Sequence, residues 1–120
     1  MTHKTISVSP DYHTRRIREI LKRYPPEPVG SFLRLQRRWI RRVVQMVDIT
    51  PKERLAALFI GSFMTPSVPF CFASMDYICR HTGCERTTVH RVVIELEKRG
   101  FMLVDRAKRG GNVYRIAMPY

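Results

Sequence analysis

Four side chains with metal-binding chemistry lie close together in the sequence: Cys79, His81, Cys84 and His90. Their spacing matches no recognised zinc pattern, and cysteine is commonly a small buried side chain. Cys71 is the third cysteine, and the absence of a C-x-x-C pair favours free thiols in a reducing compartment. Because the chain shows neither a recognised metal constellation nor a nucleophile–base pair, we expect no metal, no cofactor, no small-molecule substrate and no enzymatic activity.

A second group of side chains offers positive charge and hydrogen bonds. Its members fall at the start of one predicted helix: Arg86, Thr87, Thr88, His90 and Arg91. Arginine pairs with guanine O6 and N7 or clamps a phosphate, and threonine or histidine reads a base directly or through water. Thr88 is equally suited to a bond within the helix or to a phosphate. The group is a candidate for contacts in the major groove of duplex DNA.

The charge of the chain is compatible with such a partner. Lysine and arginine number 22 against 10 acidic residues, and the formal net charge is +12. Residues 1–49 hold 11 basic and 4 acidic side chains, and residues 50–120 hold 11 and 6. Such a field attracts polyanions, chiefly nucleic acid or an anionic lipid surface. Since no apolar run of about 18 residues and no apolar signal-type stretch occurs, we expect a cytoplasmic, nucleoid-associated protein without a membrane partner.

The candidate group is positioned by a short helix, a tight turn and a longer helix. Ser74 is placed to cap a helix over residues 75–81, and Gly83 supplies the positive φ of a three-residue turn. The longer helix spans residues 85–99, and Gly100 ends it. Apolar side chains at helical spacing form its buried stripe: Val89, Val92, Val93 and Leu96.

After this helix, the spacing of the apolar residues changes from that of a helix to that of a β-strand. Residues 101–104 and 112–116 are rich in β-forming side chains, and Gly110-Gly111 between them predicts a hairpin. Lys108 and Arg109 fall at its tip, where they suit phosphates or the minor groove. A hairpin directly after a recognition helix has the position of a wing.

These segments together resemble the winged helix-turn-helix of bacterial, phage and plasmid DNA-binding proteins, especially that of replication-initiation proteins. The matching runs are T-P-K-E-R-L-A-A-L from Thr50, H-T-G-C-E-R-T-T-V-H-R-V-V-I-E-L-E-K-R-G from His81 and N-V-Y-R-I from Asn112. The T-T-V-x-R and L-E-x-x-G portions are also similar to GntR-type regulators. The chain departs from the family at Glu85, where a serine cap is usual.

The resemblance implies a site at the start of the second helix and at the wing tip. The groove-facing residues that it implies are Arg86, Thr87, His90 and Arg91, with Lys108 and Arg109 on the wing.

Further helices are predicted before these segments. Thr50, Pro51 and Glu53 form a capping-box pattern, which begins a helix. The buried face expected for that helix is Leu55, Leu58, Phe59 and Phe63. Residues 70–72 are expected to form an edge strand or an ordered loop.

Two more helices are predicted in residues 1–49, over residues 10–24 and 31–48, with a proline-rich connector between them and Ser31 as the second cap. The second helix has a broad apolar arc: Phe32, Leu33, Leu35, Trp39, Ile40, Val43, Val44 and Val47. Its opposite arc is basic: Arg34, Arg37, Arg38, Arg41 and Arg42. The basic arc is either a solvated face or a surface for phosphates or a partner.

The sequence thus predicts a mainly α (α+β) fold, a winged helix-turn-helix over residues 50–120 with a basic two-helix extension over residues 1–49. The expected function is sequence-specific binding of double-stranded DNA as a prokaryotic, phage or plasmid transcriptional regulator. A replication-initiation or plasmid-maintenance factor is one alternative. An adaptor that binds protein or RNA through the arginine-rich helix is another. A regulator would pair as a homodimer through the N-terminal helices.

Overall fold

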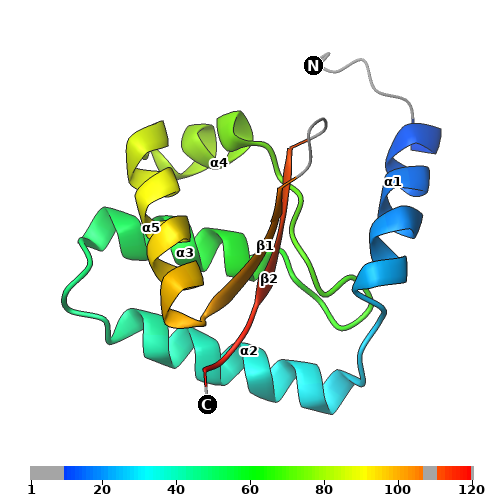
Figure 1. Cartoon of the computed structure of the whole chain (residues 1–120), viewed down its shortest axis with the longest axis horizontal. Coiled ribbons are helices and arrows are strands. Elements are labelled where there is room, and N and C mark those ends of the chain that lie inside the picture. Colours follow the sequence, from blue (N-terminus) through cyan, green and yellow to red (C-terminus); the bar gives the residue numbers. More distant parts are fainter. Residues whose placement is uncertain (1–9, 107–110, 120) are drawn as a thin grey trace.

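A computed structural model describes residues 10–106 and 111–119. Five helices and one antiparallel hairpin follow one another along this part of the chain (Figure 1): α1 (Pro10–Arg23), α2 (Val29–Val44), α3 (Pro51–Ser62), α4 (Met75–Thr82), α5 (Arg86–Arg99), β1 (Met102–Arg106) and β2 (Asn112–Ile116). The predicted fold class, mainly helical with a small β wing, is confirmed.

The core is organised around α3, which packs against α2, α4 and α5. The predicted capping box is present, because the Thr50 hydroxyl accepts from the Glu53 amide while the Glu53 carboxylate accepts from the Thr50 amide. The predicted buried face of α3 is wrong in part, since Leu55 and Phe63 are exposed and Leu58 and Phe59 are only partly buried. The apolar residues that it buries are Ile60 and three small residues: Ala56, Ala57 and Gly61.

Helix α2 begins at Val29 with Pro28 at its N-cap, so the predicted cap at Ser31 is wrong. Proline has a fixed φ and no amide hydrogen, and it suits the start of a helix without a side-chain cap. The helix ends at Val44, before the predicted end near Asp48. Beyond its end, Arg54 donates from Nη1 to the carbonyls of Met46 and Ile49, at 2.8 and 3.4 Å.

The apolar arc of α2 is wider than the surface that it buries. Phe32, Trp39 and Val43 are completely buried in the core, and Leu35 packs against it. The rest of the predicted arc is exposed, because α2 lies at the edge of the molecule and has the core on one side only (Figure 1): Leu33, Ile40, Val44 and Val47.

Trp39 fixes α2 to the rest of the fold. Its indole Nε1 donates to the carbonyl of Phe101, at 2.7 Å, and its ring lies against Gly61. A Cβ at Gly61 would lie 2.5 Å from Cζ3 of Trp39, so only glycine allows this approach of α3 to α2.

Gly61→Ala is expected to lower the free energy of unfolding by about 1–3 kcal/mol, because the new methyl group overpacks the contact with Trp39. At an unconstrained helical position the same change would raise stability by about 0.4–1 kcal/mol. The sign of the change in stability therefore tests the contact between Gly61 and Trp39. Urea denaturation followed by circular dichroism measures it. Ser62→Ala, at the exposed next residue, should stay within about 0.5 kcal/mol. A more stable Gly61→Ala protein would contradict the packing described here.

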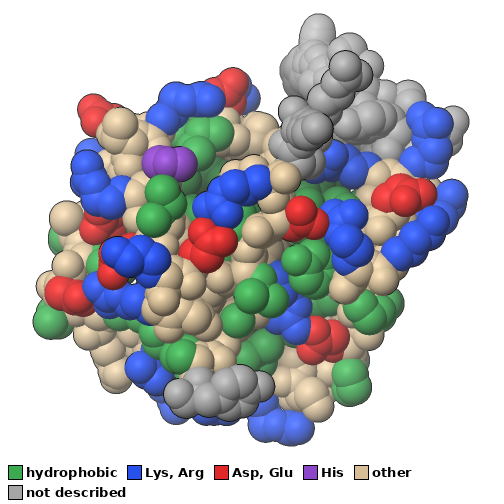
Figure 2. Space-filling model, viewed as in Figure 1, with side chains coloured by type: hydrophobic (Ala, Val, Ile, Leu, Met, Phe, Trp, Pro, Cys, Tyr) green, Lys and Arg blue, Asp and Glu red, His purple; other side chains and the backbone are tan. Residues whose placement is uncertain are grey.

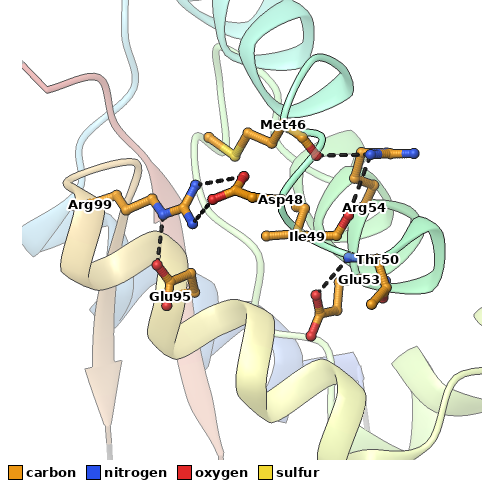
Figure 3. Close-up of polar contacts among 8 residues, drawn as sticks. All are labelled: Met46, Asp48, Ile49, Thr50, Glu53, Arg54, Glu95 and Arg99. Atoms are coloured by element: carbon orange, nitrogen blue, oxygen red, sulfur yellow. Dashed lines mark hydrogen bonds and ion pairs between the residues drawn. The ribbon is translucent and has the colours of Figure 1, made fainter.

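The linker between α2 and α3, the start of α3 and the C-terminal end of α5 meet in one polar joint (Figure 3). Arg99 donates from Nη2 to Asp48 at 2.5 Å and from Nε to Glu95 at 2.7 Å. The hydrogen bonding by Arg99 holds the pKa of the Asp48 carboxyl below its usual range. The Thr50–Glu53 capping box lies beside the joint. The joint therefore connects α5 to the linker that precedes α3.

The hairpin is covered on both sides. Met102 pairs with Ile116 and Val104 with Tyr114 in the antiparallel register. Met102, Tyr114 and Ile116 belong to the main core, whereas Val113 packs with Ile20 of α1 in a second cluster. Residues 70–72 form a loop beside the hairpin, in which Cys71 alone makes an isolated β-bridge by exchanging backbone hydrogen bonds with Tyr114. The wing therefore lies between the core and α1 (Figure 1).

Candidate nucleic-acid interface

The turn between α4 and α5 has the predicted chemistry. The Ser74 hydroxyl accepts from the amide of Tyr77 and caps α4. Gly83 follows the helix with φ at 72°, and its amide donates to the carbonyl of Cys79 at 2.9 Å. The Thr82 hydroxyl accepts from the amide of Cys84, at 3.2 Å, and so fixes the chain as it leaves the turn. These local bonds set the direction in which α5 starts.

Helix α5 buries one side and exposes the other. The predicted apolar stripe is confirmed, since all four of its residues are buried: Val89, Val92, Val93 and Leu96. Gly100 ends the helix in the left-handed conformation, at φ 85°. Glu85 occupies the N-cap without a side-chain hydrogen bond, so the amides at the start of the helix keep no side-chain acceptor there.

The candidate residues lie along the open side of α5. Arg86, Thr87, His90 and Arg91 are exposed and Thr88 is half-buried. At about 100° per residue, the four exposed side chains span one sector of the first turns of the helix. Ile94 continues that sector toward the C-terminal end and is also partly exposed. The structure thus presents the predicted group together on one surface.

Two of these arginines have acidic partners that the sequence analysis missed. Arg86 forms an ion pair with Asp76, in the first turn of α4. Arg91 lies 3.5 Å from the Glu53 carboxylate, whose side chain is only 7% exposed. Exposed ion pairs contribute little in water, so a phosphate or a base can replace Asp76 at small cost. The Glu53 carboxylate is held in place by its hydrogen bond to the Thr50 amide, and it orients the Arg91 side chain above it.

The base of the wing is joined to α5 by a second pair. Arg106 donates from Nη1 and Nη2 to Glu97, at 3.0 and 2.8 Å, and these bonds hold the pKa of the Glu97 carboxyl below its usual range. Across the hairpin, Arg23 of α1 lies 2.9 Å from Asp105. The predicted tip residues Lys108 and Arg109 lie outside the described residues. The described part of the wing is therefore fixed to α5 and to α1.

The candidate metal ligands do not assemble in the part of the chain that the structure describes. No group of three or more histidine, cysteine or acidic side chains is arranged there for a metal ion. Cys84 is buried, and His81 stacks on Tyr77 with ring centroids 4.0 Å apart. Burial raises the pKa of the Cys71 thiol to about 11, so this cysteine stays protonated at neutral pH.

The basic arc of α2 lies at the other end of the molecule. Its five arginines are all exposed, and α2 crosses near the C-terminal end of α5, where Trp39 and Arg42 both contact Phe101. In Figure 1 the N-terminal end of α5 and the end of the hairpin where β1 ends and β2 begins point away from α2. The structure therefore separates two basic surfaces that the sequence alone left unplaced.

One comparison with known proteins bears on this geometry. Residues 47–102 match the family model described as a helix-turn-helix domain. The match spans α3, α4, α5 and the first residue of β1, and so contains the turn at Gly83. Residues 47–102 are a helix-turn-helix domain. No curated protein and no solved structure matches the chain.

A helix-turn-helix domain supports DNA as the partner, and α5 takes the place of its second helix. On the face of the domain shown in Figure 2, basic and acidic side chains lie side by side, which agrees with the ion pairs of Arg86, Arg99 and Arg106. Within the described ranges, no helix has the length and apolar character that crossing a membrane requires.

Proposed function

We propose that this protein binds duplex DNA sequence-specifically through its helix-turn-helix, as a prokaryotic, phage or plasmid transcriptional regulator without enzymatic activity. One observation carries the proposal. The start of α5 exposes Arg86, Thr87, His90 and Arg91 while the opposite side of the helix is anchored in the core. A helix held in this way enters the major groove with its first turns at the base edges.

The attachment of the wing supports the same docking. Because Met102 and Ile116 share one core with the buried stripe of α5, and Arg106 pairs with Glu97, the hairpin keeps a fixed relation to the recognition helix. A wing held beside a helix in the major groove meets the adjacent phosphates or the minor groove. On this proposal, Lys108 and Arg109 make those contacts.

Binding to duplex DNA is expected to weaken steeply with salt. With about four to seven phosphate contacts, log K should fall against log[salt] with a slope of roughly −4 to −6. Fluorescence anisotropy of a labelled duplex at several salt concentrations measures this slope. Lack of duplex binding at low salt would refute the proposed function. A slope near zero would show that the positive charge does not meet phosphates.

Selection of bound sequences from randomised duplexes separates the regulator from its closest alternative. The runs from Thr50, His81 and Asn112 also resemble replication-initiation proteins, which makes an initiation or plasmid-maintenance factor the second candidate. A selected site with two-fold symmetry supports a dimeric regulator, and direct repeats support the initiator.

A further inference from the structure

Helix α2 exposes an aliphatic stripe, which Gln36 interrupts between Leu33 and Ile40. Val29, Leu33, Ile40 and Val44 lie on one line of the helix, and Val47 is exposed in the turn that follows it. Val29 is 62% exposed and Val47 is 89% exposed. Half of the exposed large hydrophobic side chains in the described part of the chain belong to this stripe. An exposed patch of contiguous apolar side chains with a polar border marks an interaction site.

An arginine row runs beside this stripe. Arg37 and Arg41 border the stripe directly, and Arg34 and Arg38 lie next to them around the helix. None of the four forms an ion pair with a residue that the structure describes, and α2 itself contains no acidic residue. Like charges three and four residues apart repel each other along a helix, and an anionic partner removes that cost.

A shallow, open hollow lies between the stripe and the row on the surface of α2. Its volume is about 400 Å³, and its lining is Leu33, Gln36, Arg37, Ile40 and Arg41. Leu33 and Ile40 supply apolar walls, whereas Arg37 and Arg41 place two guanidinium groups at its border. The hollow therefore suits an apolar side chain of a partner that has an acidic side chain beside it.

This surface is remote from the proposed DNA contacts. The Trp39 indole is bonded to Phe101, one residue beyond the end of α5, and the Arg42 guanidinium lies 4.9 Å from the centre of the Phe101 ring. Helix α5 has 14 residues and is about 21 Å long, so α2 is about that far from the first turn of α5. A duplex bound at Arg86 does not account for the α2 surface.

We propose that the exposed stripe and the arginine row of α2 form a docking surface for an acidic amphipathic helix of a partner protein. The aliphatic face of that helix would cover Leu33, Ile40 and Val44, and its flanking carboxylates would pair with Arg37 and Arg41. This is helix-to-helix recognition with apolar anchors at i, i+3, i+4 and i+7. It is independent of the proposed DNA contact and adds a second partner.

Other occupants fit the surface less well. A second copy of α2 would bring an arginine row without acidic residues against the same stripe. RNA would meet no aromatic platform on this helix, because Phe32 and Trp39 are completely buried. A lipid surface is entered most readily by exposed tryptophan, phenylalanine and leucine, and this stripe is mostly valine and isoleucine.

The test uses the full chain and two synthetic three-heptad peptides. Both peptides carry leucine at positions a and d; one carries glutamate at e and g, and the other lysine. The glutamate peptide should bind with micromolar affinity in a fluorescence titration, and the lysine peptide at least tenfold more weakly. Arg37→Glu with Arg41→Glu should weaken binding of the glutamate peptide at least tenfold and improve binding of the lysine peptide. Ile40→Asp should abolish binding of both peptides.

The matched control places the same charge change on another exposed helix. Arg15→Glu with Arg18→Glu on α1 should leave peptide binding within about twofold. Arg37→Gln with Arg41→Gln, a milder change, should weaken it by an intermediate factor, and circular dichroism confirms the fold of each variant. Failure of the glutamate peptide to bind, or equal binding by the α2 variants, would overturn the proposal.

Three further results would assign the surface to a different occupant and would also overturn it. These are a dimer in sedimentation that Ile40→Asp dissociates, tighter α2-dependent binding to phosphatidylglycerol vesicles, and tighter α2-dependent binding to single-stranded RNA. Duplex DNA binding, measured in parallel on the same variants, should stay within about twofold. Failure of the proposed docking surface is thereby distinguished from failure of the proposed DNA contact.

Discussion

Trp39→Ala is expected to lower the free energy of unfolding by about 3–5 kcal/mol, a large part of the 5–15 kcal/mol typical of a domain. The indole is the largest of the fully buried side chains, at 0% exposure. Its removal leaves a cavity between α2 and α3, beside Gly61. It also leaves the Phe101 carbonyl without the donor that now lies 2.7 Å away.

Urea denaturation followed by circular dichroism measures the loss, because the variant lacks the only tryptophan of the chain as a fluorescent probe. Trp39→Phe keeps most of the apolar volume and removes the donor, so about 1–3 kcal/mol should be lost. Val44→Ala, an exposed change on the same helix, should stay within about 0.5 kcal/mol. If Trp39→Ala costs less than 1 kcal/mol, α2 does not share the core of the helix-turn-helix.

The elements around the turn could be predicted because their signals are local. Ser74 caps α4, Gly83 takes positive φ after it, and Gly100 ends α5, each within a few residues of the feature that it determines. The buried stripe of α5 is equally local, since four apolar side chains repeat at helical spacing. The missing cap bond at Glu85 agrees with the residue type found there.

The faces of α2 and α3 were predicted less well because packing between helices decides them. Leu55 and Phe63 were expected on the buried face of α3, but the contact with Trp39 requires Gly61 at the interface. Periodicity gave the centre of the apolar arc of α2. It could not show where the core stops, and so it did not separate buried Val43 from exposed Val44.

The ion pairs of the site join residues that are far apart in sequence. Glu53 and Arg91 are 38 residues apart, and Asp48 and Arg99 are 51 apart. No spacing rule connects such positions before the fold is known. The residue types of the candidate site were therefore predictable, whereas the acidic side chains that hold Arg86 and Arg91 were not.

Arg86→Ala and Arg91→Ala are each expected to weaken binding to the preferred duplex by about 1–3 kcal/mol, or about 5- to 150-fold, and to relax base preference. Both side chains project from the exposed start of α5, where a bidentate bond to guanine or a phosphate clamp can form. Fluorescence anisotropy with the selected duplex and a scrambled duplex of the same length separates the two roles. A base contact lowers the affinity ratio of the two duplexes, whereas a phosphate contact weakens both alike.

Asp76→Asn should act in the opposite direction, since it removes a negative charge beside the DNA surface and releases Arg86 from its ion pair. We expect tighter binding by a few-fold, and a smaller gain when the change is made in the Arg86→Ala background, where only the loss of the negative charge acts. Arg80→Ala, at an exposed residue of α4, is the control for loss of one positive charge and should change affinity less than Arg86→Ala does. If substitutions at Arg86, Arg91 and Asp76 all leave duplex affinity unchanged while the protein still binds DNA, α5 is not the recognition helix and another surface makes the contact.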